Sequence, residues 1–263
     1  MKKENVVDYG TWIPEYIIGT LISIAVLCIG TSLVNTYVIK RPFITLIFTV
    51  LGFIIIGIAL YLRMSSSVID NKHGGTIIEL SKAVLNKLNI NRKGKGKILD
   101  VGCGNGALTI TAAKRFNNMT VEGVDLWSDD WNFSQEQAEA NAKLEKVKKR
   151  VSFRQADMKS LPYNDETFDA VICDMAFYNV KKHQKEAVKE ALRVLKKGGS
   201  FSFQDKFGNT SMFGDINDFM DELKREGITE IYYIEDTHKA EFIPKYMQVP
   251  GLMYHMGILY GKK

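Results

Sequence analysis

Two long apolar runs open the chain, and a sequence of mixed polarity follows them. No charged residue occurs within 16–39 or within 42–62, and the basic pair Lys40 and Arg41 separates the two runs. A bilayer core about 30 Å thick is crossed by about 20 helical residues, so each run is long enough to span it. The pattern predicts two transmembrane helices, at about 13–39 and 42–62, joined as a hairpin.

Other interpretations of these runs fit less well. A signal peptide has a shorter apolar segment, of about 7–15 residues, that ends at a cleavage site of small residues. The rest of the chain gives no reason for two uncharged helices in its core. A hairpin that dips into one leaflet without crossing stays an alternative. The positive-inside rule places basic residues on the cytoplasmic side of a membrane. Lys40 and Arg41 therefore favour a cytoplasmic loop, whereas Lys2, Lys3 and Arg63 favour cytoplasmic hairpin ends.

The pattern changes after residue 62. Serine and glycine residues predict a polar linker over 64–75. Beyond it, short apolar strands alternate with amphipathic helices, which is typical of βαβ units and a parallel sheet. Residues 1–63 are therefore expected to form a membrane hairpin and 76–263 an α/β domain. Strands are expected at 98–101, 120–124, 151–155, 170–173, 200–204, 229–235 and 253–261, and helices at 76–89, 106–116, 134–149, 181–196 and 212–226.

Composition narrows the function classes. Apolar residues make up 46% of the 263 residues and charged residues 25%, which excludes a disordered chain. Three cysteines with no C-x-x-C spacing speak against a disulfide scaffold or a zinc ribbon, and no metal site is expected. The net charge of +5, from 35 basic and 30 acidic residues, is too small and too scattered to indicate a nucleic-acid partner.

A glycine-rich turn joins the first predicted strand of the domain to a helix. Gly102, Gly104 and Gly106 alternate with other residues just after Val101. Glycines let the backbone turn tightly and approach a ligand closely, and the helix that follows offers free N–H groups at its start. With Ala107, the same glycines also satisfy a loose dinucleotide pattern, so a nicotinamide cofactor is an alternative.

Acidic residues near the ends of three successive strands help to decide which nucleotide cofactor the turn binds. Asp125 suits the ribose hydroxyls of either nucleotide and does not discriminate. Asp100 precedes the glycines and would repel a pyrophosphate, whereas it would attract an ammonium or a sulfonium. Asp157, after the third strand, could accept from an adenine amino group. S-adenosylmethionine carries all of these groups, and the set predicts it as the ligand at the sheet crevice.

These motifs resemble those of the class I S-adenosylmethionine-dependent methyltransferases, of the type 11 and type 25 small-molecule kind. The resemblance covers 76–210, and 229–261 fits more loosely; Leu192–Gly199 matches the helix and turn before the family's fifth strand. It implies a Rossmann-like seven-stranded sheet of order 3-2-1-4-5-7-6, with strand 7 antiparallel. The cofactor-binding residues that it and the pattern indicate are Asp100, Gly102, Cys103, Gly104, Asn105, Gly106, Asp125, Leu126, Trp127, Asp157, Met158 and Asp174.

The aromatic stretch after Asp125 is longer than the family's usual link and has two interpretations. Trp127 is expected to contact the adenine. Trp131 and Phe133 either wall the substrate pocket or hold the next helix to the sheet. Ser134 begins a capping-box sequence, which favours the second interpretation. The acidic pair at 129–130 is expected to be a solvated loop rather than a metal site.

The sequence names no catalytic base. A sulfonium is already an activated methyl donor, so positioning and exclusion of water can carry most of the catalysis. Asp174 and Tyr178 are candidates to orient the acceptor, and Asp174 alternatively supports the cofactor loop. The segment 174–177 lacks the two prolines typical of family members that methylate nucleic-acid bases.

The expected protein is a membrane-anchored methyltransferase, multi-pass with two spans, that acts on a small, lipophilic acceptor. Its domain is expected on the cytoplasmic side, because the cofactor is made in the cytosol. Two alternatives stay open: an anchored methyltransferase with a soluble small-molecule substrate, and a non-catalytic membrane module that binds the cofactor. The sequence predicts neither the acceptor atom nor the oligomeric state.

Overall fold

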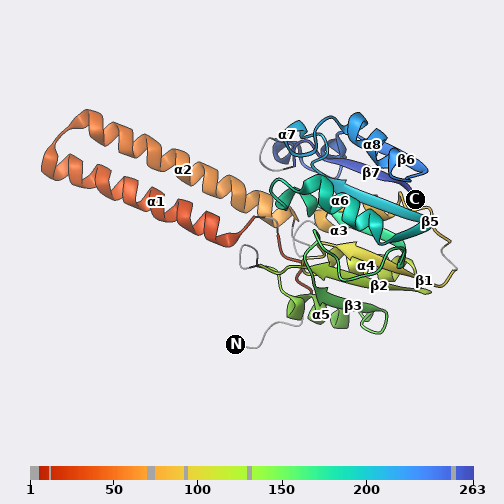
Figure 1. Cartoon of the computed structure of the whole chain (residues 1–263). Helices are drawn as coiled ribbons and strands as arrows, with labels where there is room; N and C mark the ends of the chain where they lie inside the picture. Colours follow the sequence, from red (N-terminus) through yellow and green to blue (C-terminus); the bar gives the residue numbers. More distant parts are fainter. Residues whose placement is uncertain (1–5, 12, 70–74, 92–93, 129–131, 250–252) are drawn as a thin grey trace.

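The computed structural model describes residues 6–11, 13–69, 75–91, 94–128, 132–249 and 253–263. It consists of a helical hairpin that projects from a globular α/β domain (Figure 1). Helix α1 covers Glu15–Val34, a short π-helical turn covers Asn35–Ile39, and helix α2 covers Pro42–Ile69. The two long helices lie side by side along their length.

Small and polar side chains hold the hairpin helices together. Ser32 and Thr49 are joined through their hydroxyl groups at 2.6 Å, and the Asn35 amide donates to the Thr45 hydroxyl at 2.8 Å. A Cβ on Gly52 would lie 3.0 Å from an Ile29 side-chain carbon, so the helices approach closely there. Close small-residue contacts and polar bonds between helices are what hold helix pairs together in lipid, where apolar side chains gain nothing from leaving the solvent.

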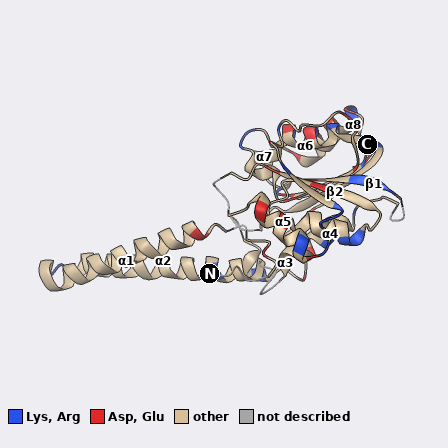
Figure 2. Ribbon diagram, turned by 90° about the horizontal axis from the view of Figure 1, so that it is seen from below, with Lys and Arg blue, Asp and Glu red and all other residues tan. Residues whose placement is uncertain are grey.

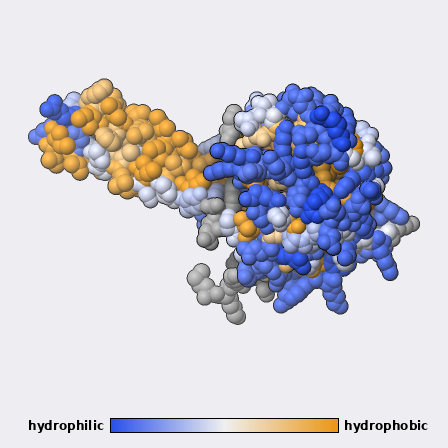
Figure 3. Space-filling model, in the orientation of Figure 1, coloured by the Kyte–Doolittle hydropathy of each residue, from blue (hydrophilic) through white to orange (hydrophobic). Residues whose placement is uncertain are grey.

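The outer surface of the hairpin is apolar. By length and composition, both helices could cross a membrane, and only 22% and 11% of the residues in their apolar windows are buried. Figure 3 shows the hairpin as a hydrophobic projection from a hydrophilic head, and Figure 2 shows that charged residues gather on the head. The helices are therefore not the buried core pair of a soluble protein.

Helix α2 continues past the predicted end of the second apolar run. It ends at Ile69 rather than near residue 62, so the first part of the predicted 64–75 linker is helical. Ser65 and Ser66 are buried, and Ile69 belongs to the core of the domain. Their polar composition was a misleading signal, because packing against the domain overrides the weak preference of serine for loops.

The domain contains a seven-stranded sheet of order β3-β2-β1-β4-β5-β7-β6, which confirms the predicted fold. Strand β7 runs antiparallel to β5 and β6, and the other neighbouring strands that the structure describes pair in parallel. The strands are β1 Gly96–Val101, β2 Met119–Asp125, β3 Val151–Gln155, β4 Phe168–Asp174, β5 Leu195–Asp205, β6 Glu230–Ile234 and β7 Gly257–Lys262. The helices are α3 Thr76–Leu85, α4 Ala107–Arg115, α5 Gln135–Leu144, α6 Gln184–Arg193, α7 Thr210–Phe213 and α8 Ile216–Arg225.

Helices cover both faces of the sheet, and side chains alternate between them. On β1, Ile98 packs with α3 and α4, whereas Leu99 packs with α6 and α8. Both side chains are fully buried. This alternation is the period of two that places successive strand residues on opposite faces of the sheet.

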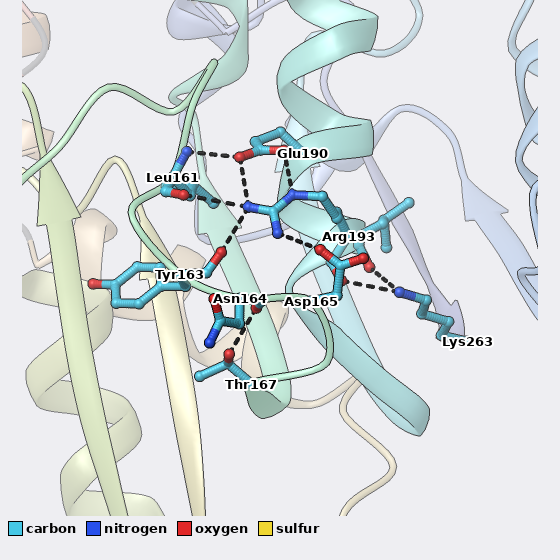
Figure 4. Close-up of polar contacts among 9 residues, drawn as sticks. Leu161, Tyr163, Asn164, Asp165, Thr167, Glu190, Arg193 and Lys263 are labelled. Carbon is cyan, nitrogen blue, oxygen red and sulfur yellow. Dashed lines mark hydrogen bonds and ion pairs between the residues drawn. The ribbon is translucent and has the colours of Figure 1, made fainter.

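Arg193 at the end of α6 fixes the chain between β3 and β4 (Figure 4). Its guanidinium donates to the carbonyl groups of Leu161 and Tyr163, at 3.2 and 2.9 Å, and to the carboxylates of Glu190 and Asp165. A planar guanidinium suits such a fork of acceptors. Arg193 therefore serves the architecture of the domain.

Candidate active site

A cavity of about 460 Å³ lies at the carboxyl ends of β1, β2 and β4. Its volume is in the range of small-molecule and cofactor sites, and its place is the crevice where open α/β sheets bind ligands. Ten of the twelve predicted cofactor residues line it: Asp100, Gly102, Cys103, Gly104, Asn105, Asp125, Leu126, Asp157, Met158 and Asp174. Among the described residues, Gly106 and Trp127 adjoin the lining without being part of it.

The glycine-rich turn follows β1 closely because two of its amides bond to β2. The N–H groups of Gly102 and Cys103 both donate to the Val124 carbonyl, at 2.8 and 3.0 Å. Gly102 has φ +76°, and a Cβ there would lie 2.1 Å from the Ala176 Cβ. A left-handed backbone and this close approach together require glycine. Gly106, at φ +86°, leads into helix α4.

Asp100 is fully buried at the end of β1, where it lines the cavity. One carboxylate oxygen accepts from the Thr109 hydroxyl at 2.5 Å, and the other has no hydrogen-bond partner. Burial raises the pKa of Asp100 to about 7. A buried carboxylate oxygen without a partner is costly, and a cationic group in the cavity would supply the missing partner.

Asp174, at the end of β4, also lines the cavity and is partly buried. The Gln204 amide donates to its carboxylate at 2.9 Å, and burial raises its pKa to about 7. Asp205, at the end of β5, is also fully buried, and burial raises its pKa to about 6. Three adjacent strands thus end in acids, fully buried on β1 and β5 and partly buried on β4, which gives this end of the sheet a strong preference for positive charge when they are ionised.

Asp125 is oriented by two backbone amides. Its carboxylate accepts from the N–H of Gly104 at 2.8 Å and from the N–H of Trp127 at 2.9 Å. The Trp127 indole N–H in turn donates to the Gly104 carbonyl at 3.0 Å. Trp127 therefore locks the glycine-rich turn to the end of β2. Its predicted contact with an adenine stays a prediction.

Two non-glycine residues next to the cavity have left-handed backbones. Trp127 has φ +46° and Met175, which lines the cavity, has φ +56°. Such conformations cost about 1–3 kcal/mol and concentrate at functional sites. Met175 is held there by its N–H, which donates to the Gln204 carbonyl at 2.8 Å.

In the link between β2 and α5, the structure supports the pocket interpretation for Phe133 and shows the predicted cap at Ser134. Phe133 lines the cavity, and the Ser134 hydroxyl accepts from the Gln137 N–H at 3.1 Å, which confirms the helix cap. Trp131 and the acidic pair at 129–130 lie outside the described residues.

Sequence reasoning missed one wall of the cavity. Tyr9 lines it and is buried, with 3% of its surface exposed. It belongs to residues 6–11, here called the N-terminal strap, which precede the first apolar run. Ile77, from the start of α3, also lines the cavity. Apolar periodicity marks Ile77 as a core residue, but no local signal connects Tyr9 to a site formed by residues about 100 positions away.

The sheet order and the glycine-rich turn with its acidic neighbours define the class I methyltransferase fold. Residues 98–199 match the family model of the methyltransferase domain. The match covers about two fifths of the chain and includes the glycine-rich turn and the acids at 100, 125, 157 and 174.

Two curated relatives align with this part of the chain. The ubiquinone/menaquinone biosynthesis C-methyltransferase of Pseudomonas paraeruginosa is 36% identical over 104 residues, which are 39% of each protein. The fatty-acid O-methyltransferase of Mycolicibacterium smegmatis is 34% identical over 109 residues, 41% of this chain and 36% of the relative. The alignments thus span about two fifths of these relatives.

Solved structures share the fold over a larger part of the chain. Geranyl diphosphate C-methyltransferase from Streptomyces coelicolor superposes with a TM-score of 0.54 at 16% identity, over 70% of this chain and 75% of its own. The cyclase SpnF superposes with a TM-score of 0.53 at 21% identity, over 71% of this chain and 81% of its own. At this identity the likeness concerns the fold, and the chemistry must be argued from the site.

Proposed function

We propose that this protein is a membrane-anchored S-adenosylmethionine-dependent methyltransferase that methylates a small lipophilic acceptor. The observation that carries the proposal is the buried Asp100 carboxylate, whose unpartnered oxygen lies at a cavity next to a glycine-rich turn. A pyrophosphate would be repelled there, whereas the ammonium and sulfonium of the methyl donor would complete the site. The matched domain family supports the same cofactor.

The residues of the cavity fit the parts of this cofactor. Asp100 and Asp174 would attract the positive groups of the cofactor. The glycines of the turn have no side chains, so the cofactor could approach the backbone closely there. Asp125, held by two backbone amides, would accept from the ribose hydroxyls, and Asp157, which also lines the cavity, would accept from the adenine amino group. When bound, the cofactor supplies a methyl group already activated on sulfur. What the protein adds is alignment of the acceptor and exclusion of water.

We place the acceptor beside the part of the cavity wall that comes from the two segments flanking the hairpin. Tyr9 precedes α1 and Ile77 follows α2. Met175 and Val180 add apolar surface to the lining, next to the polar residues Asn179 and Lys181. A wall built from both flanks of a membrane hairpin suits a substrate dissolved in the bilayer. Relatives named for quinone and fatty-acid methylation agree with a lipophilic acceptor.

The test uses membranes that contain the full chain and radiolabelled S-adenosylmethionine. We expect label in the organic extract of inside-out vesicles, which expose the cytoplasmic face, and none with sealed right-side-out vesicles. Membranes carrying the Asp100→Asn variant are the control. Label in the aqueous phase would favour a soluble acceptor, and cofactor binding without transfer to any fraction would favour the non-catalytic module.

Cofactor affinity should depend on pH because the cavity acids titrate near neutrality. Cation binding favours the ionised forms of Asp100 and Asp174, whose pKa values burial raises to about 7. Affinity should therefore fall as pH drops from 7 to 5.5, by about tenfold per pH unit for each acid that must lose a proton. Calorimetry in two buffers of different ionisation enthalpy should show proton release on binding. An affinity constant across this range would contradict the assignment.

The base of the hairpin should lie at the lipid headgroups. The Tyr61 hydroxyl donates to the Tyr246 carbonyl at 2.6 Å, and the two rings meet edge to face. Tyrosine favours the membrane interface. The full chain is reconstituted into vesicles and an NBD fluorophore is attached to the cysteine of the Tyr246→Cys variant. The emission maximum of this fluorophore should lie at a shorter wavelength than in water. The matched control is Tyr232→Cys, on the exposed strand β6, which should emit as in water. Equal emission at both sites would contradict this placement.

A further inference from the structure

The N-terminal strap, residues 6–11, is built into the cavity wall. The buried Tyr9 side chain lines the cavity beside the glycine-rich turn, and its hydroxyl donates to the Glu145 carboxylate at 3.2 Å. Tyr9 also belongs to the hydrophobic core that includes Leu108 of helix α4. The strap is thus packed as part of the domain, although it precedes the first membrane helix.

Asn141 clamps the strap to the glycine-rich turn. Its side-chain oxygen accepts from the Asp8 N–H at 2.9 Å, and its amide donates to the Asp8 carbonyl at 2.7 Å. The same amide donates to the Asn105 carbonyl at 2.9 Å. Asn141 is fully buried in helix α5, where a polar side chain is tolerated only when its hydrogen bonds are satisfied. One side chain therefore connects strap, helix and turn.

Gly10 brings the strap against an aromatic ring of the cavity. It has φ +71°, and a Cβ there would lie 2.7 Å from a Phe133 ring carbon. The other edge of the same ring lies 3.4 Å from where a Cβ of Gly104 would be. Phe133 is therefore held between the strap and the glycine-rich turn, so a displaced strap would release a side chain that lines the cavity.

Little chain separates the strap from the membrane hairpin. Ile13 packs with Ile18 of α1 and Ala59 of α2, and α1 begins at Glu15. Four residues between Gly10 and Glu15 reach at most about 18 Å, counted as five steps of about 3.6 Å. The strap is thus joined to the hairpin by a short connection, and Ile13 within this connection packs on both helices.

We propose that the N-terminal strap is a cofactor-binding element, and that the seating of the hairpin sets its position and thereby the affinity for the cofactor. The proposal rests on the proposed function, because the cavity must take the methyl donor. The hairpin is then part of the binding site as well as an anchor.

The test measures binding of S-adenosylhomocysteine, the unreactive demethylated product, to the full chain in lipid nanodiscs. Gly10→Ala should weaken binding at least tenfold through its clash with Phe133. Gly198→Ala is the matched control: its φ of +74° is similar, no atom lies within 4 Å of its Cβ position, and it is remote from the cavity. It should stay within twofold of wild type. Saturating ligand should slow hydrogen exchange of the amides in 6–10 at least tenfold.

A second pair of variants tests the coupling to the hairpin. Four Gly-Ser residues inserted after Thr11 should weaken binding about fivefold, whereas the same insertion after Lys40, at the far turn, should have no effect. If wild type binds and Gly10→Ala binds equally well with unchanged exchange, the strap proposal is wrong and the proposed function stands. If the two insertion variants bind S-adenosylhomocysteine with equal affinity, the proposed coupling between the hairpin and the strap is wrong. A wild-type chain that binds neither the product nor the donor overturns both proposals.

Discussion

Asp100→Asn is expected to weaken S-adenosylmethionine binding by about 100-fold. Asparagine fills the same space but has no negative charge for the cationic ligand. Removing one member of a buried charge pair costs about 2–5 kcal/mol, and each 1.4 kcal/mol is tenfold in affinity. Isothermal calorimetry on the solubilised full chain measures the loss. The control is Asp169→Asn, at the opposite end of β4, where the carboxylate binds Lys196 at 2.7 Å; its affinity should be unchanged.

The same substitution should stabilise the ligand-free protein at pH 8. Burial raises the folded-state pKa of Asp100 to about 7 from an ordinary value of 3.8. A raised acid pKa means that the folded state holds its proton more tightly, so stability is lost as pH rises from about 4 through 7. Asparagine has no such ionisation. A thermal midpoint above that of wild type at pH 8, together with weaker binding, would separate a binding role from a structural one. A lower midpoint at pH 8 would contradict the assignment.

Gly102→Ala is expected to abolish measurable cofactor binding and to lower the free energy of unfolding by about 2–5 kcal/mol. A left-handed conformation costs alanine about 1–2 kcal/mol, and overpacking costs about 1–3 kcal/mol more. The added methyl would meet the Ala176 Cβ at 2.1 Å, beside the cavity. Denaturant unfolding and calorimetry measure the two effects.

A double variant separates the contributions at this glycine. Adding Ala176→Gly removes the opposing methyl, so the double variant should recover the overpacking cost and keep only the backbone cost. Gly198→Ala has nearly the same φ and open space around it, and it gives the backbone cost alone. If Ala176→Gly restores neither stability nor binding, the close approach of the two loops is not what requires glycine here.

Local motifs predicted the part of the site that one supersecondary unit builds. The glycine-rich turn, Asp100 and Asp125 lie within the first βαβ unit, where glycine spacing and strand-end acids determine the geometry. Their convergence followed from strand order, because the carboxyl ends of parallel strands meet at one edge. The alternation of strands and helices predicted a parallel sheet, whereas its seven strands and their order were expected from the resemblance to the methyltransferase family.

The rest of the cavity depends on contacts between distant positions. The bonds of Asp8 to Asn141 join residues 133 positions apart, and no periodicity in either segment indicates them. Ser65 and Ser66 were predicted in a loop because of their polarity, yet they are buried in a helix that the domain packs against. Tertiary packing decided both cases, and a single sequence contains no direct record of it.

Helix α2 enters the core of the domain at Ile69, and the segment before α1 is bound to the same core through Tyr9. In the membrane-anchored protein that we propose, these two attachments would leave the cavity little freedom to tilt or to move away from the bilayer. Its height above the lipid would then be set by the fold. Acceptors would be selected by the depth at which their reactive atom lies in the leaflet, so that two lipids with the same functional group at different depths would be methylated at different rates.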